Sequence, residues 1–192
     1  MAEKIVIASG KGGVGKSSLT AGLARALSNS GKRVLMLDMD IGLRSLDLIF
    51  GTQKELLFDW GNVLDGGCEP NQAAIAAGGP MLMTAPMHMS DSFTAERIKE
   101  LADRLSKDYD YIFFDAPAGL SDGLELACAA SDRGIVVSTA DAVCVRSVNI
   151  TAGAMRSLGL EDIRLVINRF DEKAVCKKKL LNIDDVIDAV CV

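Results

Sequence analysis

Short hydrophobic runs are spaced along the chain, and longer segments with a helical repeat of apolar residues lie between them. Each run contains only four to six residues, mostly Ile, Val, Leu, Met or Phe, with little alternation between apolar and polar positions. The runs read KIVIAS, RVLMLD, PMLMTA, YIFFDA, GIVVST and IRLVIN. Because such runs are typical of strands that are covered on both faces, we predict a mostly parallel sheet.

The intervening segments predict helices. The first of them places Leu19, Leu23 and Leu27 four residues apart on one helical face. Helical patterns of this kind cover residues 17–30, 94–106, 171–180 and 183–189. Since strands and helices alternate, we expect right-handed βαβ units, an α/β fold class, and helices on both faces of the sheet.

Length and composition fit one globular domain. The 192 residues are 49% apolar and 24% charged, which is ordinary globular usage, and we expect a single domain over residues 1–192. The net charge of -5 gives no electrostatic reason to expect nucleic-acid binding. The amino terminus has no long apolar stretch behind a basic start, so we expect a cytoplasmic protein. In that compartment the five cysteines are interpreted as buried or incidental thiols.

The segment GKGGVGKSS follows the first predicted strand and opens the first predicted helix. Its spacing GxxxxGK[ST] is that of a phosphate-binding loop, in which glycines let successive backbone N–H groups converge on phosphate oxygens. Lys16 is expected to reach the β and γ phosphates, and Ser17 to give its hydroxyl to Mg²⁺. A merely flexible turn is the alternative, but it does not require the Lys-Ser pair. The nucleotide-binding residues predicted here are Gly10, Lys11, Gly12, Gly13, Val14, Gly15, Lys16, Ser17 and Ser18.

Acidic residues follow two of the predicted strands, where ligands bind on open α/β sheets. Asp115 ends the run YIFFD, and this Walker B pattern predicts a carboxylate that holds Mg²⁺ directly or through water. Asp38 and Asp40 follow the run RVLML, and Asp40 is placed to orient the attacking water. The alternative for Asp38 is that it caps the next helix.

Four segments resemble the MinD/ParA family of P-loop ATPases. GKGGVGKSS has the form of that family's deviant Walker A box, whose extra lysine is Lys11 here. MLDMDIGLRSLDLIFG resembles the switch I segment, FFDAPAGL the switch II segment, and LVINRF the segment that contacts adenine. They come in the family's order between residue 5 and about residue 170, and GLRSLD is most similar to the MinD branch.

The resemblance implies a three-layer P-loop NTPase fold and an ATP-dependent homodimer. In this family two ATP-bound subunits meet face to face, and Lys11 of each would stabilise charge on the phosphoryl group in the other. Asn168 is implied to read the adenine edge, with Arg169 beside it. The catalytic residues implied in this way are Lys11, Lys16 and Asp40, with ATP and Mg²⁺ as cofactors.

The resemblance also implies a process, which is the placement of the division site by a slow switch that hydrolyses ATP. Division-inhibitor and activator proteins are the implied partners, and a ParA-like or flagellar-number-regulating relative is the alternative within the family. Family members of the MinD type run further and end in an amphipathic membrane-binding helix. We expect this sequence to lack that carboxyl-terminal part, so membrane association is implied only for a longer form.

Two other function classes remain open from the residues. An iron–sulfur carrier or nitrogenase-like reductase shares the glycine loop but needs cysteines around a cluster, and only Cys128 lies where a bridging ligand would sit. A scaffold that binds nucleotide without turnover is the other alternative. Release of phosphate distinguishes such a scaffold from an ATPase.

Four further expectations are local. Arg44 and Asp47 are three residues apart and are expected to pair on a helix. Trp60 is expected to be buried, and His88 to be packed near the end of a strand. The run KAVCKKKLL lacks an aromatic apolar face, and we interpret it as the solvated side of a helix rather than a lipid-binding surface.

Overall fold

The computed structural model describes residues 1–177 and 179–190. Lys178 of the lysine-rich run and Cys191 lie outside the described residues. In chain order, the elements are β1 Glu3–Ser9, α1 Lys16–Asn29, β2 Val34–Asp38, α2 Leu46–Phe50, α3 Trp60–Leu64, α4 Pro70–Ala73, β3 Ile75–Ala76, β4 Met81–Met83, α5 Ala95–Leu105, β5 Tyr111–Ala118, α6 Asp122–Ala129, β6 Arg133–Ser138, α7 Ala142–Ser157, β7 Ile163–Ile167, α8 Glu172–Cys176 and α9 Ile183–Ala189.

The strands form one seven-stranded sheet in the order β3-β4-β2-β5-β1-β6-β7. Every neighbouring pair is parallel except β3 and β4, which are antiparallel. The six hydrophobic runs of the sequence supply all the parallel strands, which confirms the prediction of a mostly parallel sheet. The short strand β3 is an addition that the runs did not predict.

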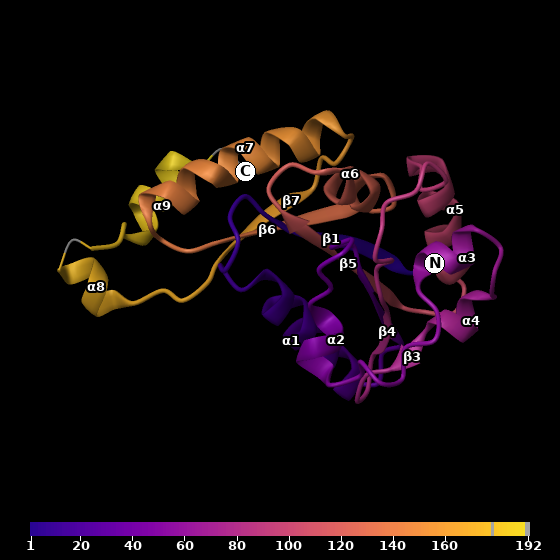
Figure 1. Cartoon of the computed structure of the whole chain (residues 1–192). Helices are drawn as coiled ribbons and strands as arrows, with labels where there is room; N and C mark the ends of the chain where they lie inside the picture. The colour runs from indigo at the N-terminus through magenta and orange to yellow at the C-terminus, as the bar shows by residue number, and fades with distance from the viewer. Residues whose placement is uncertain (178, 191–192) are drawn as a thin grey trace.

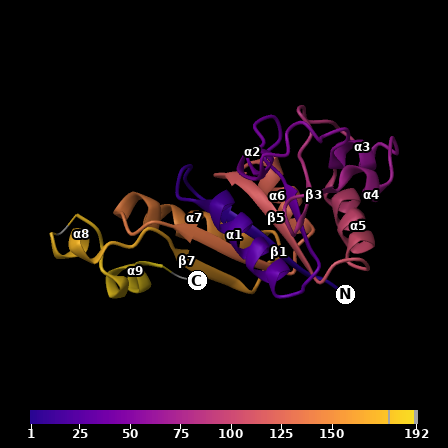
Figure 2. The ribbon, with the colours of Figure 1, turned by 90° about the horizontal axis from the view of Figure 1, so that it is seen from below.

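Helices cover both faces of the sheet (Figures 1 and 2). Alternate residues of each central strand point to opposite faces, as the pleat requires. In β2, for example, Leu35 and Leu37 pack in one apolar cluster with residues of α3, α5, α6 and α7. Val34 and Met36 pack in a second cluster with residues of α1 and α2. The predicted α/β class with three layers is therefore confirmed.

The central strands end together, and this brings the predicted site residues to one edge of the sheet. Asp38 at the end of β2 lies in register with Asp115 of β5. On the other side of β5, Ile7 of β1 is also in register with Asp115. The segment that leaves β1 two residues later is the glycine loop, so this loop begins beside both carboxylates.

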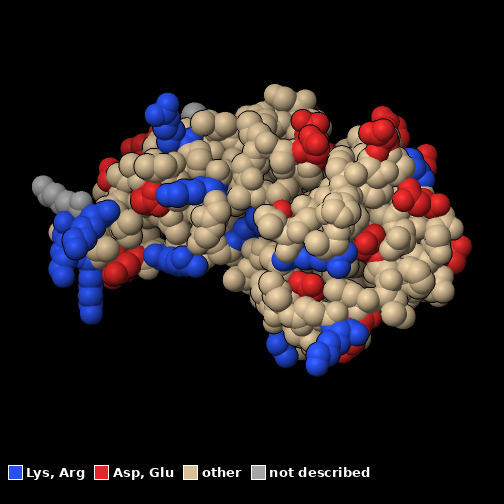
Figure 3. Space-filling view, viewed as in Figure 1, with Lys and Arg blue, Asp and Glu red and all other residues tan. Residues whose placement is uncertain are grey.

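The last two helices, α8 and α9, lie at one end of the molecule (Figure 1). The backbone carbonyl of Ala189 accepts a hydrogen bond from the Asn149 side chain of α7, which holds the end of α9 against that helix. Lys173, Lys177 and Lys179 are exposed, and basic side chains gather at this end in Figure 3. Their exposure agrees with the solvated surface that we expected, but α8 ends at Cys176, so only Lys173 lies within a helix and the predicted helix over 171–180 is shorter than expected. Within residues 1–177 and 179–190, every helix is too short or too polar to cross a membrane.

The local expectations had mixed outcomes. Trp60 is fully buried, as predicted, and its indole N–H donates to the Asp38 carbonyl at 2.8 Å. The pairing of Arg44 with Asp47 was wrong: Arg44 pairs with Asp59 at 3.2 Å, because the Asp47 carboxylate is buried and accepts from a backbone N–H. The packing of His88 was also wrong, since this side chain is exposed on the loop that follows β4.

Candidate functional site

The glycine loop joins the carboxyl end of β1 to the amino end of α1. Gly15 is the residue before the helix and has φ 98°, a left-handed conformation that side chains other than glycine adopt at a cost. The first turn of α1 has no capping side chain and no acidic residue. Its backbone N–H groups and the positive end of its dipole are therefore left for an anion, which suits phosphate.

Two side chains from distant segments press against the loop. A Cβ at Gly10 would lie 2.6 Å from the Cβ of Ser147 in α7, so only glycine fits there. A Cβ at Gly15 would collide with the side-chain amide of Asn168. These contacts show that α7 and the residue after β7 pack closely against the loop.

Asn168 ties the end of β7 to the glycine loop. Its Nδ2 donates to the backbone carbonyl of Val14 at 2.8 Å, and its Oδ1 accepts from the backbone N–H of Arg169 at 2.9 Å. Arg169 has φ 54° and lines the hollow beside the loop. Both residues that we assigned to adenine therefore lie at the loop, and in this structure the Asn168 amide contacts protein backbone.

Lys16 and Asp115 form a buried ion pair at the base of the loop. The Lys16 ammonium lies 3.0 Å from Asp115 Oδ1, and the two residues are 8% and 0% exposed. Lys16 also donates to Ser17 Oγ at 3.3 Å, and the Thr20 hydroxyl donates to Asp115 Oδ1 at 2.9 Å. Such additional hydrogen bonds are what offset the desolvation of a buried pair. Lys16 and Ser17 of the glycine loop and Asp115 of the Walker B pattern are thus brought together.

Thr20 and Ser45 are site residues that sequence reasoning missed. Thr20 lies one helical turn after Lys16, and its position behind the Lys-Ser pair was the available signal. The Ser45 hydroxyl donates to Ser17 Oγ at 3.0 Å and lies 3.5 Å from Asp115 Oδ2. Nothing in the order of residues connects Ser45 with Ser17, 28 positions earlier.

Asp38 serves as a clamp for the loop that follows β2. Its carboxylate accepts three backbone hydrogen bonds, from Asp40 at 2.9 Å, Ser45 at 2.8 Å and Leu46 at 3.0 Å. Burial raises the pKa of Asp38, and these three hydrogen bonds oppose that rise. The bonds from Ser45 and Leu46 lie at the start of α2, so Asp38 binds the beginning of this helix from outside it, while Ser45 occupies the N-cap position.

Asp40 and Lys11 differ in how they lie at the site: Asp40 lines the hollow and Lys11 is exposed. Asp40 lines the same hollow of about 290 Å³ as Lys16, Ser17 and Ser45. Burial raises the pKa of Asp40, and the positive charge of Lys16 opposes the rise. Lys11 is exposed, and among residues 1–177 and 179–190 it forms no ion pair. The extra lysine is therefore separate from the Lys16 cluster and accessible.

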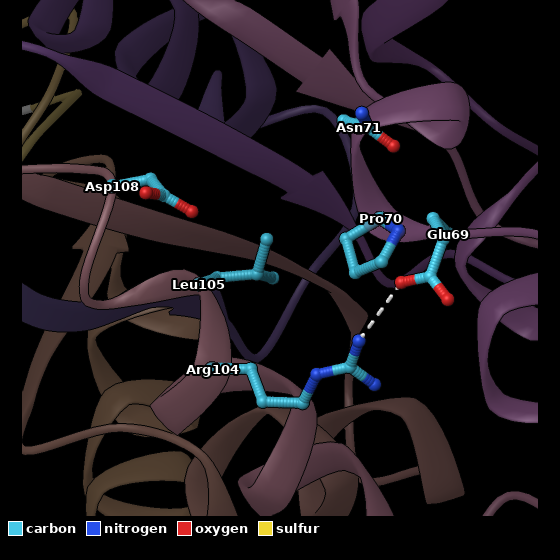
Figure 4. A pocket seen from close by; sticks show the side chains of 6 residues that line it. All are labelled: Glu69, Pro70, Asn71, Arg104, Leu105 and Asp108. Carbon is cyan, nitrogen blue, oxygen red and sulfur yellow. Dashed lines mark hydrogen bonds and ion pairs between the residues drawn. The ribbon is translucent and has the colours of Figure 1, made fainter.

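A second hollow, of about 320 Å³, lies away from the loop (Figure 4). Figure 4 shows the Arg104 guanidinium reaching toward Glu69, with Pro70 beside it, and the two charged groups are 3.2 Å apart. Both side chains are more than half exposed. This hollow shares no lining residue with the glycine-loop hollow, and an exposed surface ion pair of this kind contributes little. The chemistry therefore points to the loop.

The oxygens at the loop fit a hard divalent cation. The Ser45 hydroxyl lies within hydrogen-bonding distance of both the Ser17 hydroxyl and the Asp115 carboxylate. Mg²⁺ prefers oxygen ligands of this type and is usually held by one or two protein groups together with phosphate oxygens. The donor set is therefore compatible with Mg²⁺ bound beside a nucleotide.

Comparison with known proteins agrees with this geometry. A ParA family model described as NUBPL iron-transfer P-loop NTPase matches residues 1–180. The chain is 36% identical to the putative septum site-determining protein MinD of Emiliania huxleyi, over 98% of this chain and 71% of that protein. It is 35% identical to the septum site-determining protein MinD of Bacillus subtilis, over 97% of this chain and 72% of that protein.

Solved structures give the same result. The MinD chain of the MinC:MinD cell division protein complex of Aquifex aeolicus superposes with a TM-score of 0.87 at 32% identity, covering 97% of this chain and 77% of that one. MinD of Pyrococcus horikoshii, complexed with Mg-ADP, superposes with a TM-score of 0.84 at 25% identity, covering 100% of this chain and 79% of that one. With the glycine loop beside the buried pair of Lys16 and Asp115, the chain belongs to the ParA/MinD family of P-loop NTPases and has their fold.

Proposed function

We propose that this chain is a MinD-type ATPase that binds Mg·ATP, hydrolyses it, and acts in placing the division site. The observation that carries the proposal is the convergence of Lys16, Ser17 and Asp115 at the uncapped amino end of α1. The similarity to MinD proteins supports the process, and the Mg-ADP complex of the Pyrococcus horikoshii protein supports the cofactors.

Nucleotide binding rearranges the central ion pair in this proposal. Lys16 pairs with Asp115 in the present structure, and entering phosphates offer its ammonium two further anionic partners. Lys16 then holds phosphate oxygens, while loop N–H groups and the α1 dipole hold the rest. Asp115 is released by this exchange, and Asp115 and Ser17 are the residues that would hold Mg²⁺. A bound Mg²⁺ neutralises charge that develops on the phosphate oxygens.

Asp40 is the residue that we assign to the attacking water. It lies on the wall of the loop hollow, and as a carboxylate it accepts a hydrogen bond from a water molecule and orients its oxygen. The Asp38 carboxylate accepts a hydrogen bond from the backbone N–H of Asp40 at 2.9 Å. This bond limits how far the Asp40 side chain can move. Positioning of this kind is the main source of catalysis in phosphoryl transfer.

Lys11 completes the site in a second copy of the chain. Its exposure at the loop makes its ammonium available to a partner subunit, and a cation delivered in this way stabilises charge on the transferred phosphoryl group. Self-association then depends on ATP, and hydrolysis ends it. The protein would therefore work as a slow switch whose two states differ in assembly.

A division-inhibitor protein is the partner that the comparisons support. The Aquifex aeolicus structure is a complex of MinC with MinD, and this chain covers 77% of that MinD chain. We propose a MinC-like protein as the partner here and an activator that accelerates hydrolysis. The Ser147 side chain faces Gly10 of the glycine loop, so position 147 is part of the loop's support.

Iron–sulfur chemistry is the rival class, and the family model's description mentions iron transfer. Cys128, the cysteine that sequence placed nearest to a bridging position, is buried in α6. Burial raises the pKa of its thiol to about 12. Because this residue is only 2% exposed, its thiol cannot reach a cluster that bridges two subunits. The proposed ATPase activity does not require Cys128.

Phosphate release tests the proposal. The purified protein is expected to release phosphate from ATP with Mg²⁺ and to stop in EDTA. Lys16→Ala removes the cation that holds the phosphates, so nucleotide affinity should fall at least ~10-fold and release should cease. Lys107→Ala, an exposed lysine in the turn between α5 and β5, is the control and should behave as the wild type. A protein that binds Mg·ATP tightly but releases no phosphate is a scaffold and contradicts the ATPase.

A further inference from the structure

We propose that Ser45 is a ligand of the bound divalent cation, so that the metal joins the loop after β2 to the glycine loop. This inference rests on the proposed function, because the cation would arrive with the nucleotide. The expected protein oxygens at the metal were those of Ser17 and Asp115. The structure adds a third, from the segment that resembles switch I, for which the sequence predicted no metal ligand.

The spacing of the oxygens matches a magnesium shell. Mg²⁺ takes six oxygens at about 2.0–2.1 Å in octahedral geometry, so neighbouring ligand oxygens lie about 3 Å apart. The Ser45 and Ser17 hydroxyl oxygens are 3.0 Å apart. The distance from Ser45 Oγ to Asp115 Oδ2 is 3.5 Å, slightly longer than that edge. Ser17 and Ser45 therefore already stand as two adjacent corners of such a shell.

Two of these three groups, Ser17 and Asp115, already contact a positive charge. The Lys16 ammonium lies 3.0 Å from Asp115 Oδ1 and 3.3 Å from Ser17 Oγ. In the present structure the Ser45 hydroxyl uses its proton toward these oxygens. A hydroxyl keeps two lone pairs when it donates, so Ser45 has electrons to offer a cation without losing its contact with Asp115.

The backbone around Ser45 is built to aim this hydroxyl. The Ser45 N–H is held by the buried Asp38 carboxylate at 2.8 Å. Arg44 has φ 49°, a left-handed conformation that is uncommon for a residue other than glycine. Its guanidinium is fixed by Asp59 at 3.2 Å. Strain of this kind persists only where the surroundings hold it, and here it turns Ser45 toward the glycine loop.

A metal ligand at Ser45 has a consequence for Asp40. The two residues are joined by one short loop, and the Asp38 carboxylate accepts a backbone hydrogen bond from each. A cation that binds Ser45 therefore fixes the loop that carries the water-orienting carboxylate. Metal binding and the positioning of Asp40 would be one event.

ADP affinity measured with and without Mg²⁺ tests this inference without reading activity. Isothermal titration calorimetry of ADP in Mg²⁺ and in EDTA gives the gain in affinity that the metal supplies. Ser45→Ala should keep the wild-type affinity in EDTA and lose at least about tenfold of the Mg²⁺-dependent gain, as other lost metal contacts do. The affinity of the protein–ADP complex for Mn²⁺, measured by electron paramagnetic resonance, should fall by the same factor.

Matched variants distinguish the effect of the Ser45 hydroxyl from the effect of side-chain shape. Ser45→Thr keeps the hydroxyl and should retain the gain, whereas Ser45→Val has the shape of Thr and should lose it. Ser121→Ala, an exposed serine on the loop after β5, should match the wild type. If Ser45→Ala and Ser45→Val both gain as much affinity from Mg²⁺ as the wild type, the metal-ligand role of Ser45 is overturned and the proposed function is not affected. A wild type that gains nothing from Mg²⁺ overturns the proposed function, and this inference with it.

Discussion

Asn168 joins the glycine loop to the end of β7 through one side-chain amide. One N–H of that amide is used on the Val14 carbonyl, and its oxygen accepts from the N–H of Arg169. The second N–H and the second lone pair of the oxygen remain for a ligand. The family resemblance assigns Asn168 to adenine, and this arrangement lets the same side chain hold the loop and read a base.

The two roles of Asn168 predict different losses. If Asn168 reads adenine, Asn168→Ala should weaken ADP by about tenfold or more and GDP much less, since a lost hydrogen-bond partner is felt only by the base that used it. Fluorescence titration with labelled ADP and GDP measures both affinities. Asn71→Ala, an exposed asparagine at the remote hollow, is the control. Equal losses for both nucleotides would limit Asn168 to holding the loop.

At the scale of elements, α7 has an N-terminal cap whose stabilising effect depends on pH. Asp141 precedes this helix, and its carboxylate accepts from the Cys144 backbone N–H at 3.0 Å and from the Thr139 hydroxyl. Hydrogen bonds from Cys144 and then Thr139 lower the pKa of Asp141 from 3.8 to about 2. Because the folded pKa is the lower one, the ionised cap stabilises the fold above pH 3.8 and loses this effect as the pH falls toward 2.

Asp141→Ala should lower the free energy of unfolding at neutral pH by about 1 kcal/mol, the usual cost of a lost cap. For a domain of this size the melting temperature should fall by about 2–4 °C. The deficit should shrink as the pH is lowered toward about 3, because the wild-type cap is being protonated. Urea unfolding across this range measures it. Asp141→Asn retains a capping oxygen and no charge, so a pH dependence of stability equal to that of the wild type would contradict the account.

Elements with a clear period could be predicted from the sequence, and shorter ones could not. The runs that became β1, β2 and β5 are continuous and apolar because both faces are covered, and that pattern is local. β3 is two residues long, too short for any period, and its pairing with β4 is decided by neighbours in space. The short helix α2 depends on the Asp38 clamp, which is likewise a contact between segments.

At the scale of the whole molecule, the candidate site is assembled from four segments of the chain. The glycine loop, the loop after β2, the end of β5 and the end of β7 each supply a residue. Motif spacing predicted Lys16, Ser17 and Asp115 because their chemistry follows strands that end together. Ser45 was not predicted, because its distance to Ser17 is set by the φ of Arg44 and the clamp on Asp38, and neither has a sequence pattern.

The exposed Lys11 is the residue on which ATP-dependent dimerisation rests in the proposed function. Light scattering with Mg²⁺ and a non-hydrolysable ATP analogue measures whether two copies assemble. The wild type is expected to double its mass, while Lys11→Ala stays monomeric and keeps most of its nucleotide affinity, because Lys16 still holds the phosphates. Dimerisation of Lys11→Ala equal to that of the wild type, or a wild type that remains monomeric with the analogue bound, would contradict the account.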